Sequence, residues 1–294
     1  MRISIGNDRL FNSLACRGWD QPLPPRNALS LSSKRHIRSL LSDQRMRTTN
    51  PMLSRLTDAA RATVAAPQSE RMTVAGTSTK AAILLAIVLT TAFIFWTQIE
   101  AGRPELLMPS LLIGGIGGFV VAMITAFKPM AAPWTAPIYA SLQGVFLGAV
   151  SAMYNMRFAG LPQQAVVLTF AVAFTVFVLY RAGVLRATQG FKRMMIAATV
   201  GIGVFYLGSM LLSLFGVSIG YFTSSSPLAI GVNLIIAGVA ALNLVLDFDR
   251  IEEGVRAGAP RALEWFAAFG LMVTLVWLYL ELLRLLSRLQ GRRD

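Results

Sequence analysis

Ionisable side chains are rare in the apolar part of this sequence, and the few that occur lie near its end. Of seven long apolar stretches, which begin at Ala81, the first five carry no charged residue in their interiors. The sixth ends with Asp247, closely followed by Asp249, and the seventh contains Glu281 and Arg284. A charge at membrane depth is costly and usually faces a helix-bundle interior or water. We therefore expect any chemistry to lie where the last two stretches meet.

Carboxylates in such a position can exchange protons or bind a cation. Low dielectric disfavours the ionised form, and a second carboxylate nearby disfavours it further. Oxygen ligands suit Ca²⁺, which makes Asp247, Asp249 and Glu281 possible calcium ligands. Glu264 opens the seventh stretch, across the loop from Asp249. Asn243 lies four residues before Asp247, on the same helical face, and could hydrogen-bond its carboxyl.

Two less specific interpretations of the acidic residues remain open. Glu281 and Arg284 are spaced as i and i+3 on a helix and could simply neutralise each other. Glu252 and Glu253 lie among arginines and could form local ion pairs in a solvated loop. Either arrangement would give these side chains a structural role.

The sequence lacks the residues that the catalytic and metal-binding motifs of soluble enzymes require. It has one histidine, His36, and one cysteine, Cys16, which excludes an internal disulfide, a thiolate zinc site and a multi-histidine metal centre. Residues 216–220 match the G-x-S-x-G nucleophile pattern but follow an apolar helix rather than a strand, and no histidine lies in the apolar part of the chain. We therefore expect no enzymatic activity and no cofactor.

Composition identifies the elements that must position the carboxylates. The 294 residues are 55% hydrophobic and 14% charged, whereas soluble domains are about 25% charged, and the mean hydropathy is +0.59. Each apolar stretch approaches the ~20 residues that cross a bilayer as a helix. We predict an all-α, polytopic bundle of seven transmembrane helices, near residues 81–97, 106–127, 137–154, 165–180, 195–215, 228–248 and 265–286. The patterns Gly114-x-x-x-Gly118 and Gly144-x-x-x-Gly148 predict close helix packing within the chain rather than dimerisation.

The polar start of the chain has a different character. Residues 1–80 hold 13 of the 27 Lys and Arg residues and show no apolar period, which predicts a disordered basic cytoplasmic arm with one short helix near residues 53–64. Met46 opens a segment that looks like a natural protein start. Residues 1–45 could therefore come from a start site that was placed too early. The net charge of +13 alone would suggest nucleic acid, but its distribution favours the bilayer as the partner.

Loop charges predict the orientation of the seven-helix domain at residues 81–294. If the N-terminus lies inside, the only basic residues in the outer loops between spans are Arg103 and Arg157. The inner loops hold Lys128, Arg181, Arg186, Lys192, Arg193, Arg250, Arg256 and Arg261. This bias predicts a cytoplasmic N-terminus, in what we expect to be a bacterial inner membrane. The arginine-rich tail then lies outside, unless a re-entrant last segment returns it.

Three segments resemble the Bax inhibitor/YccA-like membrane proteins. They are residues 138–151, which resemble the third span of that family, 244–252, which resemble the end of the sixth, and 278–286, which resemble an L-Y-L-D/E motif in the last. The resemblance runs from Met46 to the C-terminus. It implies a seven-helix bundle with the last helix at its centre, and a pH-sensitive calcium leak in which Asp247 and Glu281 share protons.

The sequence also departs from the family pattern. Position 281 is Glu rather than Asp, and Gln143 stands where many relatives have Glu. Because Asp247 and Glu281 are 34 residues apart, a direct pair would need a displaced seventh helix, and Asp249 or Glu264 could replace one member. The resemblance therefore favours a proton-modulated cation leak. The alternative is a non-conducting interaction protein that regulates a membrane protease or another bilayer partner.

Overall fold

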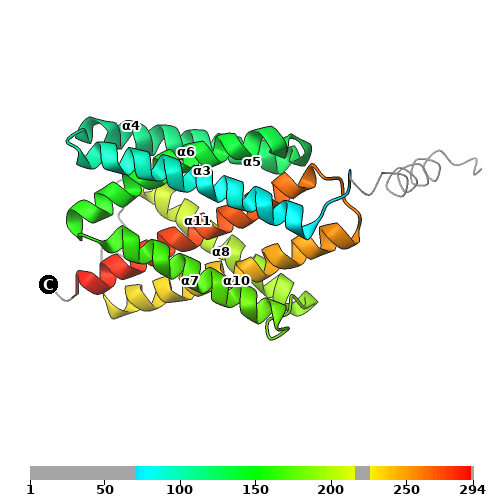
Figure 1. Ribbon diagram of the computed structural model, residues 1–294. Helices are drawn as coiled ribbons and strands as arrows, with labels where there is room; N and C mark the ends of the chain where they lie inside the picture. The colour runs from blue at the N-terminus through cyan, green and yellow to red at the C-terminus, as the bar shows by residue number, and fades with distance from the viewer. Residues whose placement is uncertain (1–69, 216–225, 293–294) are drawn as a thin grey trace, which may run out of the picture. The chain divides into compact units, whose positions relative to one another are not determined.

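The computed structural model describes residues 70–215 and 226–292 (Figure 1). These residues form only helices, apart from one isolated β-bridge between Arg71 and Pro260. Within this part of the chain, seven helices or helix groups are long and apolar enough to span a membrane, so the predicted seven-span, all-α fold is confirmed. The predicted helix near residues 53–64 and the G-x-S-x-G pattern lie outside the described residues, as do Cys16 and His36.

The seven spans have the following bounds. The first is α3 (Val74–Glu100); the second joins η2 (Pro104–Leu106), α4 (Leu107–Leu112), the π-helical turn η3 (Ile113–Gly117) and α5 (Gly118–Phe127). The third joins η4 (Pro129–Ala131) and α6 (Ala132–Arg157). The others are α7 (Leu161–Arg181), α8 (Gln189–Leu214), α10 (Pro227–Arg256) and α11 (Leu263–Gln290).

Several helices extend beyond the apolar stretches that predicted them. α3 begins at Val74 rather than Ala81, because the Thr73 side chain caps it by accepting a hydrogen bond from Gly76 N at 2.9 Å. α10 continues to Arg256, so Glu252 and its neighbours lie on a helix and not in the predicted loop. Hydropathy detects only the hydrocarbon-facing part of a helix, whereas the backbone hydrogen bonds continue past it. α11 is continuous, with no re-entrant break.

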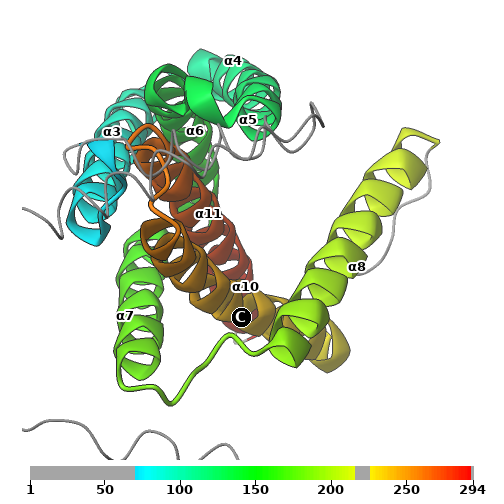
Figure 2. The same cartoon turned by 90° about the vertical axis from the view of Figure 1, so that its right-hand side faces the viewer.

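The last helix lies in the middle of the bundle. α3, α6, α7 and α10 all pack against α11, and α4 and α5 cover the outer side of α6 (Figures 1 and 2). Much of α11 is buried on several sides, including Leu278, Leu283 and the carboxyl-bearing Glu281. The implied central position of the last helix is therefore confirmed.

Glycines allow the helices around this centre to approach closely. A Cβ placed on Gly148 of α6 would lie 2.6 Å from Ala92 O of α3, and one on Gly144 would overlap Thr91 of the same helix. A Cβ on Gly114 would lie 2.8 Å from Leu142 O of α6. The two predicted glycine patterns thus serve contacts within the chain.

Candidate functional site

Asp247 is buried on α10 with incomplete pairing. Its side chain is 7% exposed, and Oδ1 lies 3.7 Å from Arg250 Nη1 one turn later. The hydroxyl of Thr274, on α11, lies beside the carboxyl. Oδ2 has no hydrogen-bond partner among the residues that the structure describes. A buried carboxylate oxygen left unpaired is expensive, so this atom is suited to take up a proton or meet a cation.

A cavity of about 500 Å³ reaches this carboxyl. It lies between α5, α8, α10 and α11, and α8 stands apart from α5 on this side (Figure 2). Polar groups of Asp247, Thr199, Asn243 and Thr274 line it among apolar side chains. The wall also includes the charged Arg250 of α10 and Trp277 of α11. The cavity therefore brings hydroxyl, amide and carboxylate groups to one space inside the membrane-spanning part.

Asn243 does not form the hydrogen bond to Asp247 that its spacing had allowed. Its Nδ2 donates to Thr199 Oγ1 of α8 at 2.9 Å and to Val239 O at 2.9 Å. The i, i+4 spacing places both side chains on one helical face, but a neighbouring helix supplies the amide with another partner.

Glu281 occupies a different and closed environment on α11. It is 1% exposed, and four side chains donate to its carboxylate. Tyr206 Oη donates to Oε1 at 2.7 Å, Asn233 Nδ2 to Oε2 at 2.8 Å and Trp277 Nε1 to Oε1 at 3.2 Å. Arg284 Nη1 forms the ion pair, 3.1 Å from Oε2. Glu281 and Arg284 thus do pair, as the spacing had allowed.

Sequence reasoning missed three of these partners. Trp277 lies four residues before Glu281 on the same helix, and this spacing could have identified it. Asn233 could have been noticed as an amide inside the sixth apolar stretch. Tyr206 is on α8, 75 residues before Glu281. Its hydroxyl also accepts from Arg284 Nη1 at 2.7 Å, and its ring lies 5.3 Å from the guanidinium carbon.

The structure does not bring Asp247 and Glu281 together as a direct pair. Glu281 bonds to Asn233, which lies 14 residues before Asp247 on α10. At 1.5 Å per residue this is about 21 Å along the helix. The two carboxylates therefore occupy opposite halves of the bundle, as the long sequence separation had suggested.

Asp249 is paired with the adjoining helix. Lys192 Nζ, in the first turn of α8, lies 2.5 Å from Asp249 Oδ2 and 2.5 Å from Glu253 Oε1. The lysine thereby fixes the start of α8 against the end of α10. Asp249 is not a partner of Glu264.

Glu264 holds the start of the first span to the start of the last. It is 1% exposed and forms an ion pair with Lys80 of α3. Its Oε1 accepts from Thr73 N at 2.8 Å and from Thr73 Oγ1 at 3.0 Å. The adjoining backbone adds a hydrogen bond from Met72 N to Ala259 O at 2.7 Å. Glu264 therefore stabilises the junction between two helices that are far apart in the sequence.

Neither a calcium cluster nor a role for Gln143 is visible at these carboxylates. Within residues 70–215 and 226–292, no three Asp, Glu, His or Cys side chains converge as a metal site, and Asp247, Asp249 and Glu281 have separate surroundings. Gln143 is buried on α6 and faces Gly118 of α5.

α8 meets its neighbours through polar residues spaced seven apart. Lys192 pairs with Asp249, Thr199 bonds to Asn243, and Tyr206 bonds to Glu281. A spacing of seven is about two helical turns, so the three side chains lie along one face of α8. This stripe connects α8 to both carboxylate environments, and its period was present in the sequence although we did not predict it.

A comparison with known proteins places the chain in a family. The family model described as Bax inhibitor 1 like matches residues 50–291. Among curated proteins and solved structures, no match to this chain was found. The family match covers most of the chain and includes all seven spans, so this integral membrane protein belongs to the Bax inhibitor 1 like family.

Proposed function

We propose that the protein is a proton-modulated cation leak, with calcium as the transported ion. The observation that carries the proposal is Asp247, whose buried Oδ2 has no hydrogen-bond partner among the described residues. The same carboxyl reaches a cavity of about 500 Å³. When ionised, Asp247 attracts a cation into the cavity; when protonated, it loses that charge. Proton binding would therefore set how readily a cation enters.

Trp277 supports the idea that the cavity represents one half of a closed path. Its side chain belongs to the cavity wall, and its Nε1 donates to Glu281 Oε1 at 3.2 Å. It therefore stands between the environment of Asp247 and the cluster around Glu281. We assign Trp277 and the Glu281–Arg284 pair to the closure of the path.

α8 is the element best placed to open this closure. Its contacts with the rest of the bundle are mainly with α10, and it stands away from α5 (Figure 2). Tyr206 of α8 bonds to both Glu281 and Arg284, so displacing α8 would remove one donor from the carboxylate and one acceptor from the guanidinium. Movement of α8 against α10 and α11 would thus couple the two carboxylate sites.

We propose that the N-terminus lies in the cytoplasm and that the membrane is a bacterial inner membrane. The segment before α3 hydrogen-bonds to the α10–α11 loop. The ion pair between Lys192 and Asp249 joins the start of α8, next to the α7–α8 loop, to the end of α10. These contacts gather the arginine-rich loops at one end of the bundle (Figure 1). Positively charged loops favour the cytoplasmic side.

The closed cluster at Glu281 favours a second candidate function. Its carboxylate accepts from four side chains of the described residues and is 1% exposed, and such a dry, tightly paired cluster suits a non-conducting protein that binds a membrane protease or another bilayer partner. Purified protein in liposomes separates the two candidates. Calcium entry that changes between an acidic and an alkaline pH supports the leak. If protein-containing and protein-free liposomes show the same calcium entry at both pH values, the leak is wrong and the interaction protein remains. Neither candidate involves enzymatic catalysis.

A further inference from the structure

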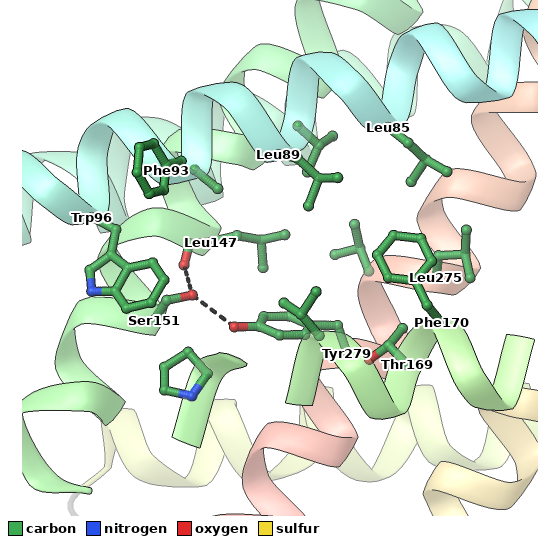
Figure 3. Close-up of a pocket in the computed structure, with 15 residues that line it drawn as sticks. Leu85, Leu89, Phe93, Trp96, Leu147, Ser151, Thr169, Phe170, Leu275 and Tyr279 are labelled. Carbon is green, nitrogen blue, oxygen red and sulfur yellow. Dashed lines mark hydrogen bonds between the residues drawn. The ribbon is translucent and has the colours of Figure 1, made fainter. Parts of the chain in front are cut away.

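A second cavity, of about 310 Å³, lies on the side of α11 that faces α3 and α7. Helices α3, α6, α7 and α11 all contribute to its wall (Figure 3). Leucine, valine and aromatic side chains form most of the lining. The cavity is separate from the carboxylate sites described above, since neither Asp247 nor Glu281 lines it.

The few hydroxyl groups in this cavity are already bonded to the protein. Ser151 Oγ donates to Leu147 O at 2.6 Å and lies 2.8 Å from Tyr279 Oη (Figure 3). Thr169 Oγ1 donates to Ala165 O at 2.6 Å. Water needs several polar partners to occupy a buried site, and apolar cavities stay dry. Trp96 Nε1, at one end of the lining, is buried with no hydrogen-bond partner among the described residues. Because the rest of the wall is apolar or already bonded, its chemistry selects an occupant that is apolar along most of its length.

The cavity opens toward the surface that faces the bilayer. Leu89 and Phe93 of α3 are 43% and 63% exposed, and Phe170 of α7 is 41% exposed, yet all three also line the cavity. Val88 and Leu147, deeper in the wall, are only 3% and 6% exposed. Because the chain spans the membrane, the medium at this opening is hydrocarbon.

The dimensions suit one hydrocarbon chain. Along α3 the lining runs from Leu85 to Trp96, a rise of eleven residue steps or about 16 Å at 1.5 Å per step. The volume of about 310 Å³ is roughly twice that of an engineered ~150 Å³ apolar cavity that binds benzene. A helix of another protein is ~10 Å or more across with its side chains, which is too wide for this space.

We propose that this cavity binds one acyl chain of a bilayer phospholipid. The polar end of the lipid lies beyond Trp96, because α3 ends four residues later at Glu100 and tryptophan favours the membrane–water interface. The chain extends from there past Phe93 and Leu89 toward Leu85 (Figure 3). The bound lipid fills the space between α3 and α7 and contacts the central helix at Tyr279.

Photocrosslinking of the full chain in phospholipid nanodiscs tests this assignment. The probe is a phosphatidylethanolamine with a diazirine in the middle of one acyl chain, and mass spectrometry maps the adducts. Lipids that merely surround the protein reach exposed residues such as Phe93. We expect additional adducts on the buried lining residues Val88, Leu147 or Tyr279, because only a chain inside the cavity reaches them.

Two neighbouring positions of α7 provide a matched pair of variants. Val166 lines the cavity, whereas Val167 is 70% exposed and does not. Val166→Trp should occupy the cavity and reduce the buried adducts several-fold, with the adducts at exposed residues unchanged. Val167→Trp should leave both classes of adduct unchanged.

The outcome for the wild-type protein decides the proposal even if Val166→Trp does not fold. Adducts confined to exposed residues in the wild type would overturn it. So would buried adducts that stay undiminished in a folded Val166→Trp protein. If a soluble diazirine alkanol labels the buried lining residues but the phospholipid does not, the cavity binds a small apolar molecule. That result would also overturn the proposal of a bound acyl chain.

Discussion

Breaking the ion pair in the Glu281 cluster should destabilise the protein strongly. Arg284→Met removes the guanidinium that lies 3.1 Å from Glu281 Oε2 and also removes a donor, 2.7 Å away, to Tyr206 Oη. Loss of one partner from a buried ion pair costs about 3–5 kcal/mol. Because neutral donors remain on Glu281 and the Arg284 side chain is 26% exposed, we expect about 3 kcal/mol, roughly a hundredfold in the unfolding equilibrium.

The second variant removes both charges. Replacing a buried pair by uncharged residues of similar size is often neutral. Glu281→Gln combined with Arg284→Met should therefore be more stable than Arg284→Met alone, by about 1 kcal/mol or more. The amide oxygen introduced by Glu281→Gln would still accept a hydrogen bond from Tyr206, as the carboxylate does.

The assay is reversible unfolding in mixed micelles with increasing dodecyl sulfate, followed by tryptophan fluorescence and far-ultraviolet circular dichroism. Arg181→Met, at the exposed end of α7, is the matched control and should shift the free energy of unfolding by less than about 0.5 kcal/mol. An Arg284→Met protein as stable as the control, or a double variant less stable than Arg284→Met, would show that the ion pair does not stabilise the bundle.

Two further outcomes follow from helix packing and loop charge. Gly144→Ala should lower the free energy of unfolding by about 1–3 kcal/mol, because the new methyl group collides with Thr91. Gly201→Ala on α8 places its methyl group in open space and should have a much smaller effect. The same micelle titration measures both variants, and equal effects would contradict the close packing at Gly144. In a background without native cysteine, an impermeant thiol reagent outside the cell should label Arg103→Cys and miss Gly190→Cys, and the reverse pattern would contradict the proposed orientation.

The spans could be predicted from the sequence because bilayer thickness imposes a length on every apolar helix. Their ends could not, since caps such as Thr73 and interfacial turns carry no hydropathy signal. Residues 74–80 thus belong to the first helix, although their composition resembles the arm before them.

The acidic residues and their partners on the same helix could be located from the sequence, but their partners on other helices could not. Charge scarcity in the spans singled out Asp247 and Glu281. Their surroundings depend on which helices meet: Asn233 and Tyr206 come from α10 and α8, and Asn243 turns to Thr199 instead of to Asp247. Only the heptad spacing on α8 could have indicated that one face of this helix makes polar contacts.

The side chain of Asp247 provides the most direct test of the proposed leak. Calcium entry into liposomes should be measured for the wild type and for Asp247→Asn, at an acidic and an alkaline pH, with Glu252→Gln as a control at the end of the same helix. Asp247→Asn keeps the shape of the side chain and removes its titration. We predict pH-dependent entry for the wild type and for Glu252→Gln, and pH-independent entry for Asp247→Asn. A folded Asp247→Asn protein with wild-type entry and pH dependence would contradict the account.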